Sequence, residues 1–292
     1  MNTKLKYWLM AARPRTLPAG ASPVILGTAV AEENGLNVPV ALATLACCLL
    51  LQTGSNIAND YFDSIHGVDG ADRLGPARVT QKGLIAPKKV RNAFLACFGA
   101  AFVLGVFLAL RGGLPIVMVG LSSIAAAYLY TGGPKPLSYL GLGEILAFVF
   151  FGPIAVLGTF YLQALEFSWK ALWVGMGPGF LSALLMSINN LRDSASDRAT
   201  GKRTVALMLG VENARRLSLG LLAAALLVPL VYAAFFPKNW PVLAAPLSSL
   251  AFFRHWRRIA LGPIDGNLNL SLGATGKYMF VYSILFSAGV LL

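Results

Sequence analysis

Charged residues are scarce in this chain: only 12% of its 292 residues are Asp, Glu, Lys or Arg, whereas 57% are hydrophobic. A soluble domain carries about a quarter charged residues, so this composition excludes an ordinary soluble protein. Metal-binding and redox residues are also few. The two histidines are too scattered for a zinc site, and the three cysteines have no metal or redox spacing. We therefore interpret Cys47, Cys48 and Cys97 as small hydrophobic residues inside the membrane.

Long apolar segments, in contrast, recur along the whole sequence, each close to the ~20 residues that cross a bilayer as a helix. We expect nine transmembrane helices, at residues 10–31, 38–58, 92–110, 113–131, 140–162, 170–190, 217–236, 239–253 and 272–292. We expect no cleavable signal peptide, and no linker or low-complexity tract divides the chain. The sequence thus predicts one all-α integral membrane domain over residues 1–292, with about nine transmembrane helices around a central cavity.

The basic residues predict the orientation of the chain, because short cytoplasmic loops accumulate Lys and Arg. With a cytoplasmic N-terminus, 21 of the 24 basic residues fall on the cytoplasmic side, and only Arg111, Lys170 and Lys238 fall outside. This bias, with attraction to anionic lipid headgroups, explains the net charge of +12 without nucleic acid as a partner. We expect a multi-pass protein of the bacterial inner membrane, or an equivalent membrane, whose site faces the cytoplasm. No obligate protein partner is indicated.

Half of the twelve acidic residues lie in two short clusters, each at the end of an apolar segment. The first spans residues 56–63 (NIANDYFD), with Asp69 and Asp72 behind it, and the second spans residues 189–197 (NNLRDSASD). Both contain the spacing Asn-x-x-x-Asp, and an Asp-Arg pair follows each, which makes a weak internal repeat. Carboxylates beside a membrane core are costly unless something pairs with them, so both clusters are candidate functional sites.

Helical geometry places the oxygen-bearing side chains of each cluster on one face. At about 100° per residue, Asn56, Asn59, Asp60 and Asp63 fall within one arc, and carboxylates this close repel each other unless cations lie between them. Oxygen ligands without His or Cys suit Mg²⁺, Mn²⁺ or Ca²⁺. Mg²⁺ usually takes one or two carboxylates together with substrate phosphate oxygens. The two clusters therefore predict at least two metal ions that hold a diphosphate from opposite sides, while nearby Lys and Arg neutralise the remaining charge.

Other interpretations stay open for several of these residues. The clusters could serve only as helix caps or loop ion pairs, although their matched spacing argues against this. At the end of the fourth expected span, Lys135 is a candidate for the diphosphate and Tyr130 for the reacting centre, or both belong to a Gly/Pro turn with an interfacial tyrosine. Arg13 and Arg15 could bind a carboxylate or lipid headgroups.

A transporter is the competing class of protein, with the acidic clusters as its permeation site. Transporter sites usually lie near the bilayer midplane on broken helices. These clusters lie instead at span ends, and long loops follow them at residues 64–91 and 194–216. Long loops of this kind are often functional lids, which favours an enzyme.

These motifs together resemble the UbiA-type membrane prenyltransferases and, within them, the 1,4-dihydroxy-2-naphthoate prenyltransferases of menaquinone and phylloquinone synthesis. The resemblance covers essentially the whole chain and rests on RPRTLPA (13–19), NDYFD (59–63) with GVD (67–69), DRLGP (72–76), YTGG (130–133), NNLRD (189–193) with the DR pair (197–198), GKRT (201–204) and, weakly, LN (268–269). The DRLGP loop points to the naphthoate branch. One departure is Gly67, where many members carry a third Asp; Asp69 is the candidate replacement.

The resemblance implies a Mg²⁺-dependent transfer of a polyprenyl or phytyl group from its diphosphate to 1,4-dihydroxy-2-naphthoate, with loss of CO₂, giving a demethylated naphthoquinol. Other aromatic acceptors, such as 4-hydroxybenzoate or homogentisate, are the alternative. The implied metal ligands are Asn59, Asp60, Asp63, Asp193 and Asp197. The implied diphosphate-binding residues are Arg73, Lys135, Arg198 and Lys202. The expected catalytic residues are Asp63, Asp193, Asp197, Tyr130 and Lys135.

Overall fold

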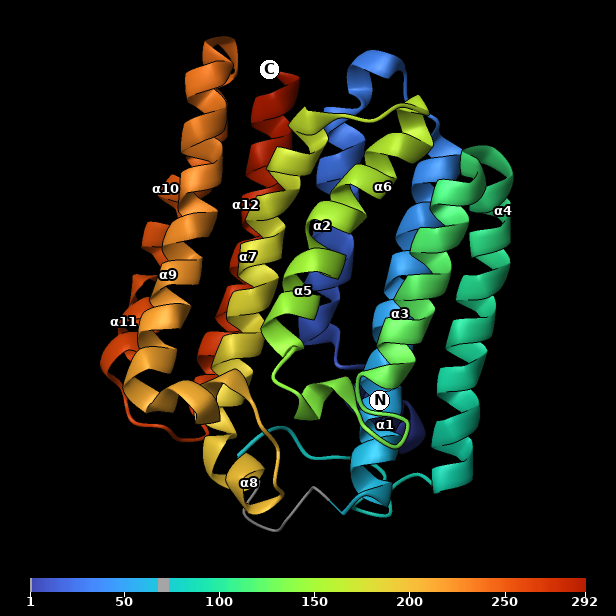
Figure 1. Ribbon diagram of the computed structural model, residues 1–292, viewed down its shortest axis with the longest axis vertical. Coiled ribbons are helices and arrows are strands. Elements are labelled where there is room, and N and C mark those ends of the chain that lie inside the picture. The colour runs from blue at the N-terminus through green and yellow to red at the C-terminus, as the bar shows by residue number, and fades with distance from the viewer. Residues whose placement is uncertain (1, 68–73) are drawn as a thin grey trace.

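The computed structural model describes residues 2–67 and 74–292, which form helices and loops without a β-strand. Figure 1 shows the long helices side by side along the long axis of the molecule. The α-helices are α1 (Thr3–Ala12), α2 (Leu17–Val30), α3 (Val38–Ile65), α4 (Pro87–Leu129), α5 (Gly143–Phe151), α6 (Pro153–Ala164), α7 (Trp169–Arg192), α8 (Ser194–Ala199), α9 (Val205–Phe235), α10 (Ala244–Leu247), α11 (Phe253–Leu261) and α12 (Leu268–Leu291). The longer 3₁₀ segments are η4 (Pro237–Leu243) and η5 (Ser248–Phe252).

Six helical segments of the described chain are long and apolar enough to cross a membrane: α3, α4, α5 joined to α6, α7, α9 and α12. Side-chain caps mark the start of two of them. The Asn37 side chain accepts a hydrogen bond from Val40 N at the start of α3, and Ser168 accepts one from Ala171 N at the start of α7. Such caps satisfy backbone donors that a helix leaves free. The expected all-α, multi-pass architecture is confirmed.

The nine expected spans do not all take the form of single long helices. Two of them lie within α4, where the chain turns back at Gly113 (φ 64°, ψ −153°), a conformation that glycine adopts without a Cβ clash (Figure 1). The first expected span is divided, and its helix α2 has 14 residues and contains Pro23. Residues 239–253 form short helical turns that include Pro241 and Pro246, each of which lacks the backbone donor of a regular helical hydrogen bond. The count of nine crossings therefore stays a prediction.

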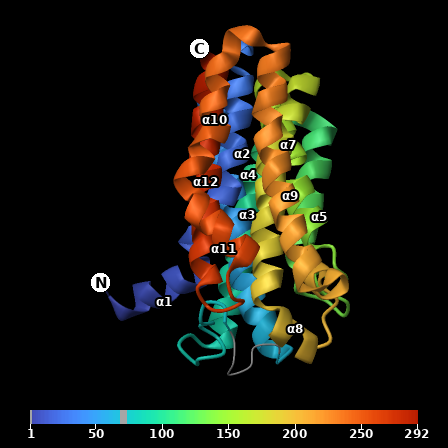
Figure 2. The ribbon, with the colours of Figure 1, turned by 90° about the vertical axis from the view of Figure 1, so that its left-hand side faces the viewer.

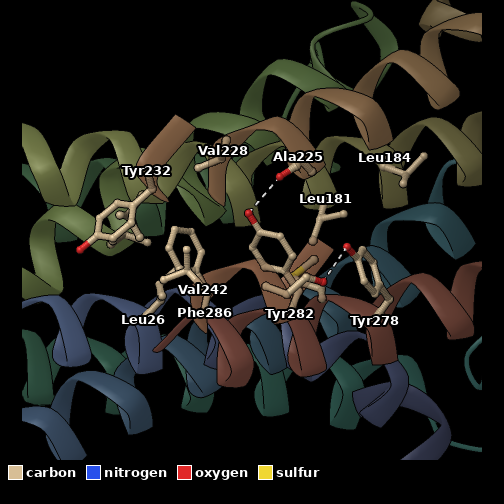
Figure 3. Close-up of a cluster of buried hydrophobic side chains, with 14 of the residues drawn as sticks. Leu26, Leu181, Leu184, Ala225, Val228, Tyr232, Val242, Tyr278, Tyr282 and Phe286 are labelled. Atoms are coloured by element: carbon tan, nitrogen blue, oxygen red, sulfur yellow. Dashed lines mark hydrogen bonds between the residues drawn. The ribbon is translucent and has the colours of Figure 1, made fainter. Parts of the chain in front are cut away.

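The largest core cluster packs α12 against α2, α7 and α9 (Figure 3). Two tyrosines of α12 are fully buried there. The Tyr282 hydroxyl donates to Ala225 O over 3.0 Å and the Tyr278 hydroxyl to Ala245 O over 3.4 Å. A buried hydroxyl without a partner would cost free energy, so these bonds fix where α12 meets its neighbours.

A second core cluster holds the loop after α3 against the helices. Val79 and Ile85 from this loop pack with Ile57 of α3 and Phe94 of α4. Figure 2 shows α1 extending away from the bundle near the end that also carries α8. The C-terminal end of α3, its following loop and α8 thus lie at one end of the molecule (Figure 1).

Candidate active site

Both acidic clusters open into one cavity of about 610 Å³. Asn59 and Asp63 line it from the last turns of α3, and Asn189, Asp193 and Asp197 line it from the end of α7 and from α8. Two segments 130 residues apart in the sequence therefore contribute oxygen atoms to the same chamber. The volume falls within the range of about 300–1,000 Å³ that is typical of small-molecule sites.

The charged lining of this cavity favours an anion. Its basic side chains are Arg13, Arg15, Arg78, Arg192 and Lys202, against three carboxylates at Asp63, Asp193 and Asp197. The remaining wall is mostly apolar and includes Leu51, Leu108, Ile116 and Leu162. Lining residues on α3 run from Thr44 to Asp63, about 29 Å at the helical rise per residue. The cavity thus joins a charged end to a long apolar channel.

In the first cluster, Asp63 is buried in the last turn of α3 and forms an ion pair with Arg78 from the following loop. The C-terminal end of a helix is unfavourable for a carboxylate, because the helix dipole is negative there, and the arginine compensates. The neighbouring ligand candidate, Asn59, accepts a hydrogen bond of 2.7 Å through its Oδ1 from the Thr131 hydroxyl. The turn that follows α4 therefore orients the Asn59 amide.

Asp60 has a different environment from the rest of its cluster. It is 2% exposed and does not line the cavity. Its carboxylate accepts hydrogen bonds from Val79 N (2.9 Å), Thr80 N (2.9 Å) and the Thr80 hydroxyl (2.5 Å). Val79 and Thr80 therefore bind both carboxylate oxygens of Asp60. These two residues directly follow Arg78, which pairs with Asp63.

The second cluster is organised by Arg192, which is 2% exposed. Its guanidinium donates two hydrogen bonds to Asp193, of 2.8 and 2.6 Å, and one of 2.6 Å to Asn189 Oδ1. A fourth bond, of 2.7 Å, reaches Asn269 Oδ1 at the start of α12. The Asn269 amide in turn donates to Leu74 O over 2.8 Å. This chain of bonds ties the second cluster to the loop that follows the first.

Asp197 lies in the short helix α8, outside the long helices. Burial raises the pKa of this carboxyl above its ordinary value, and the positive charge of Lys202 acts in the opposite direction. The Lys202 ammonium lies 3.4 Å from Asp197 Oδ1 and 5.5 Å from the centre of the Tyr139 ring. Lys202 also lines the cavity, so its charge is available to a ligand there.

The structure does not bring every residue suggested by the sequence to the cavity. Tyr130 lines it and donates to Met186 Sδ over 3.1 Å. Lys135 and Arg198 are exposed and do not line it. Arg73, Asp69 and Asp72 lie outside the described residues.

Arg192 and Arg78 both line the cavity, and neither is among the site residues that the sequence predicts. Arg78 has the weaker signal of the two. Nothing in the sequence except its place in a loop after the first cluster distinguishes it from the other basic residues of that loop. Its pairing with Asp63 depends on how the loop folds back over the end of α3, which residue spacing does not reveal.

The donor atoms fit magnesium only together with a phosphate ligand. No group of three or more His, Cys, Asp or Glu among the described residues could hold a metal ion by itself. One wall offers the Asp63 carboxylate and the Asn59 oxygen. The other offers two carboxylates and an asparagine oxygen, from Asp193, Asp197 and Asn189. Mg²⁺ is commonly held by one or two carboxylates, with phosphate oxygens and water completing its octahedron. The residues present fit an ion that binds with its diphosphate.

Comparison with known proteins identifies the family. The model of the UbiA prenyltransferase family matches residues 21–286. The chain belongs to this family. Among its relatives, the 1,4-dihydroxy-2-naphthoate octaprenyltransferase of Mycobacterium tuberculosis is 42% identical over 82% of this chain and 83% of that protein. The enzyme of that name from Escherichia coli is 36% identical over 99% and 96%. The interpretation as a prenyltransferase, rather than a transporter, is confirmed.

Solved structures show the same UbiA fold. A UbiA homolog from Archaeoglobus fulgidus bound to GPP and Mg²⁺ superposes with a TM-score of 0.68 at 14% identity, covering 98% of this chain and 100% of that one. A UbiA homolog from Aeropyrum pernix superposes with a TM-score of 0.65 at 17% identity, over 94% and 96%. At this identity the likeness is one of fold.

Proposed function

We propose that this chain transfers a prenyl group from a prenyl diphosphate to 1,4-dihydroxy-2-naphthoate, with loss of CO₂, to give a demethylated naphthoquinol. The observation that carries the proposal is the single cavity, which joins two oxygen-rich clusters and five basic side chains to an apolar channel. The names of relatives at 42% and 36% identity support the naphthoate as acceptor. A phytyltransferase relative, 27% identical, acts on 2-carboxy-1,4-naphthoquinone according to its name, which supports the same acceptor class.

The basic side chains of the cavity hold the diphosphate at its charged end. Arg78 and Arg192 are buried beside Asp63 and Asp193, and Lys202 approaches from the loop after α8. Positive charges placed in advance around a leaving group stabilise the charge that develops when its bond breaks. When a diphosphate binds, we expect both arginines to divide their donors between carboxylate and phosphate oxygens, since a guanidinium has five.

The metal ligands we propose are Asn59 and Asp63 on one wall and Asp193 and Asp197 on the other. Bound Mg²⁺ would supply Lewis-acid neutralisation of the diphosphate. We assign Asp60 to a different task, because its oxygens already hold Val79 and Thr80. It fixes the loop that carries Arg78.

The apolar wall of the cavity protects the reacting carbon. It holds the prenyl tail and excludes water that would otherwise capture an allylic cation. In the transfer, the allylic C–O bond breaks and its electron pair leaves with the diphosphate. The ring carbon that bears the carboxylate forms the new C–C bond, and the electron pair of its C–CO₂ bond restores aromaticity as CO₂ leaves. We assign Tyr130, which lines the cavity and bonds to Met186 of α7, to this reacting centre.

The membrane arrangement we propose keeps the nine crossings, the cytoplasmic N-terminus and the single domain over residues 1–292. The six long segments leave out three of these crossings, and α2, the second arm of α4 and the segment from η4 to η5 supply them. The distribution of basic residues supports an active site open to the cytoplasm, at the inner face of a bacterial membrane.

The test of the function is turnover by purified protein in lipid nanodiscs. Geranyl, geranylgeranyl, octaprenyl and phytyl diphosphates are each combined with 1,4-dihydroxy-2-naphthoate, 4-hydroxybenzoate or homogentisate, with Mg²⁺ or with EDTA. We expect a decarboxylated, prenylated naphthoquinol by mass spectrometry, equimolar pyrophosphate, and no product with EDTA. Turnover of only 4-hydroxybenzoate or homogentisate would overturn the acceptor, and absence of pyrophosphate release with every pair would overturn the reaction.

A further inference from the structure

Glu144 is a buried carboxylate beside the cavity that has no role in the reaction as described so far. It lies in the first turn of α5 and is 7% exposed. Its Oε1 accepts a hydrogen bond of 2.9 Å from Asn190 Nδ2 of α7, and none of the described residues donates one to its Oε2. A buried carboxylate oxygen without a donor costs free energy. A carboxylate buried at the start of an apolar segment long enough to cross a membrane therefore points to a function.

Asn190 connects this carboxylate to the cavity. Asn190 lines the cavity, whereas Glu144 does not. An ionised carboxylate only accepts hydrogen bonds, so the bond to Glu144 must use the amide nitrogen of Asn190. This fixes the orientation of the amide. Oδ1 and the second hydrogen of Nδ2 are then the groups that Asn190 can offer to a ligand.

The pair lies near the charged end of the cavity. Asn190 precedes Asp193 by three residues on α7, so the two side chains are neighbours on one helix face, about 5–6 Å apart at their Cβ atoms. On the other side, a Cβ at Gly143 would lie 3.1 Å from the Tyr130 hydroxyl. The Glu144–Asn190 pair is therefore close both to Tyr130, through Gly143, and to Asp193, near the place proposed for the diphosphate.

The chemistry of the two substrates decides which of them the pair recognises. An ionised prenyl diphosphate carries acceptor oxygens and hydrocarbon, and no hydrogen-bond donor. A dihydroxynaphthoate carries two hydroxyl donors. Asn190 Oδ1 is an acceptor that faces the cavity, while Glu144 stays behind it and holds one hydrogen of Asn190 Nδ2. We propose that Asn190 binds a ring hydroxyl of the aromatic acceptor, and that Glu144 is the positioning residue that holds the Asn190 amide in the orientation needed. This inference rests on the proposed function and names the acceptor half of the same site.

Such a contact also bears on reactivity. A hydroxyl that donates to an amide oxygen beside a buried negative charge gives more electron density to its ring, which makes the ring a better nucleophile toward the allylic carbon. No proton leaves the hydroxyl in this step, and the balance of the transfer is unchanged. The contact orients and activates the ring.

The experiment compares Glu144→Gln and Asn190→Leu with the wild-type enzyme and with Ser187→Ala as a matched control. Ser187 lies one turn before Asn190 on α7, bonds to Ser218 over 2.9 Å and does not line the cavity. Glutamine has a donor as well as an acceptor, so it no longer fixes the Asn190 amide. We expect both site variants to raise the KM for the naphthoate about tenfold, while the KM for the prenyl diphosphate stays within about twofold. The control should change neither value.

A second readout separates recognition from a general loss of structure. Inhibition constants are measured for 1-hydroxy-2-naphthoate and 4-hydroxy-2-naphthoate, each of which lacks one hydroxyl. The wild-type enzyme should bind one of them about tenfold more weakly than the other, and Asn190→Leu should reduce this ratio to near one, as in a double-mutant cycle. If Glu144→Gln fails to fold, the ratio of the two inhibition constants in Asn190→Leu still tests whether Asn190 binds a ring hydroxyl.

The inference is overturned if the ratio is the same in Asn190→Leu and the wild type, or if the variants raise the KM for the diphosphate instead. Failure of the proposed function looks different, because wild-type enzyme would then not turn over the naphthoate at all.

Discussion

Replacing Asp60 by alanine tests whether the loop after α3 builds the diphosphate site. The buried carboxylate accepts three hydrogen bonds, of 2.5–2.9 Å, from Val79 and Thr80. Hydrogen bonds to a charged group contribute about 1.5–3 kcal/mol each and are not additive within one network. We take about 3 kcal/mol for the set, which is a factor of about 100 in the equilibrium between docked and undocked loop. Because Arg78 directly precedes these residues, undocking of the loop should also reduce the fraction of molecules in which Arg78 contacts Asp63.

We expect Asp60→Ala to lower kcat/KM for the prenyl diphosphate by about 10- to 100-fold, and Asp60→Asn, which keeps one acceptor oxygen, to lower it less. The Mg²⁺ concentration for half-maximal activity should not change. Trypsin reports the loop directly, since Lys82 is exposed within it, and cleavage there should become faster in the alanine variant. Glu212→Ala, which removes only an exposed ion pair with Arg216, is the control and should behave as the wild type.

One result would refute this reasoning. If Asp60→Ala raises the Mg²⁺ requirement at least tenfold while cleavage at Lys82 is unchanged, Asp60 is a metal ligand, as the sequence first suggested, and the loop does not depend on it.

Three further changes test other parts of the account. Asp63→Asn and Asp193→Asn should each abolish turnover, because each removes a carboxylate from the charged end of the cavity, while membrane fractionation should still find both proteins inserted. Lys202→Ala should raise the KM for the diphosphate at least several-fold more than Lys135→Ala, because only Lys202 lines the cavity. Gly27→Ala should lower the free energy of unfolding by about 1–3 kcal/mol, because the new Cβ would lie 2.5 Å from a backbone oxygen of α6.

Each of these has its own contrary result. Wild-type rates in either asparagine variant would remove that carboxylate from the site. An equal rise in the KM for the diphosphate in Lys202→Ala and Lys135→Ala would mean that the exposed Lys135 also reaches the substrate. For the glycine, Gly99→Ala is the matched control, because its Cβ would meet nothing within 4 Å. A loss of stability as large in Gly99→Ala would show that helix propensity, and not the close approach, is responsible.

The membrane character and the pairing of the acidic clusters were predictable because both depend on local pattern. Apolar length predicts a spanning helix, and the repeated Asn-x-x-x-Asp spacing places the two clusters at span ends. That both ends open into one cavity agrees with what the matched spacing suggested. The spans differ from expectation where proline and glycine intervene, at Gly113 and in residues 239–253.

The individual side chains were harder to predict, because the turns and loops around them have no periodicity. A helical wheel puts Asp60 and Asp63 on one arc, but Asp60 lies at the edge of that arc and meets Thr80, whereas Asp63 meets the cavity. Arg78 and Asn269 act through loop contacts that join segments distant in the sequence. Glu144 falls within the expected span 140–162, and the sequence does not reveal its bond to Asn190.

The most direct test of the central claim is a structure of the protein with Mn²⁺ and a non-hydrolysable prenyl thiodiphosphate, with the metal located by its anomalous scattering. We expect metal sites at both walls of the one cavity, about 2.0–2.3 Å from oxygens of Asp63 and of Asp193 or Asp197, joined through the same diphosphate. Metal at only one cluster, or a diphosphate bound outside the cavity, would contradict it.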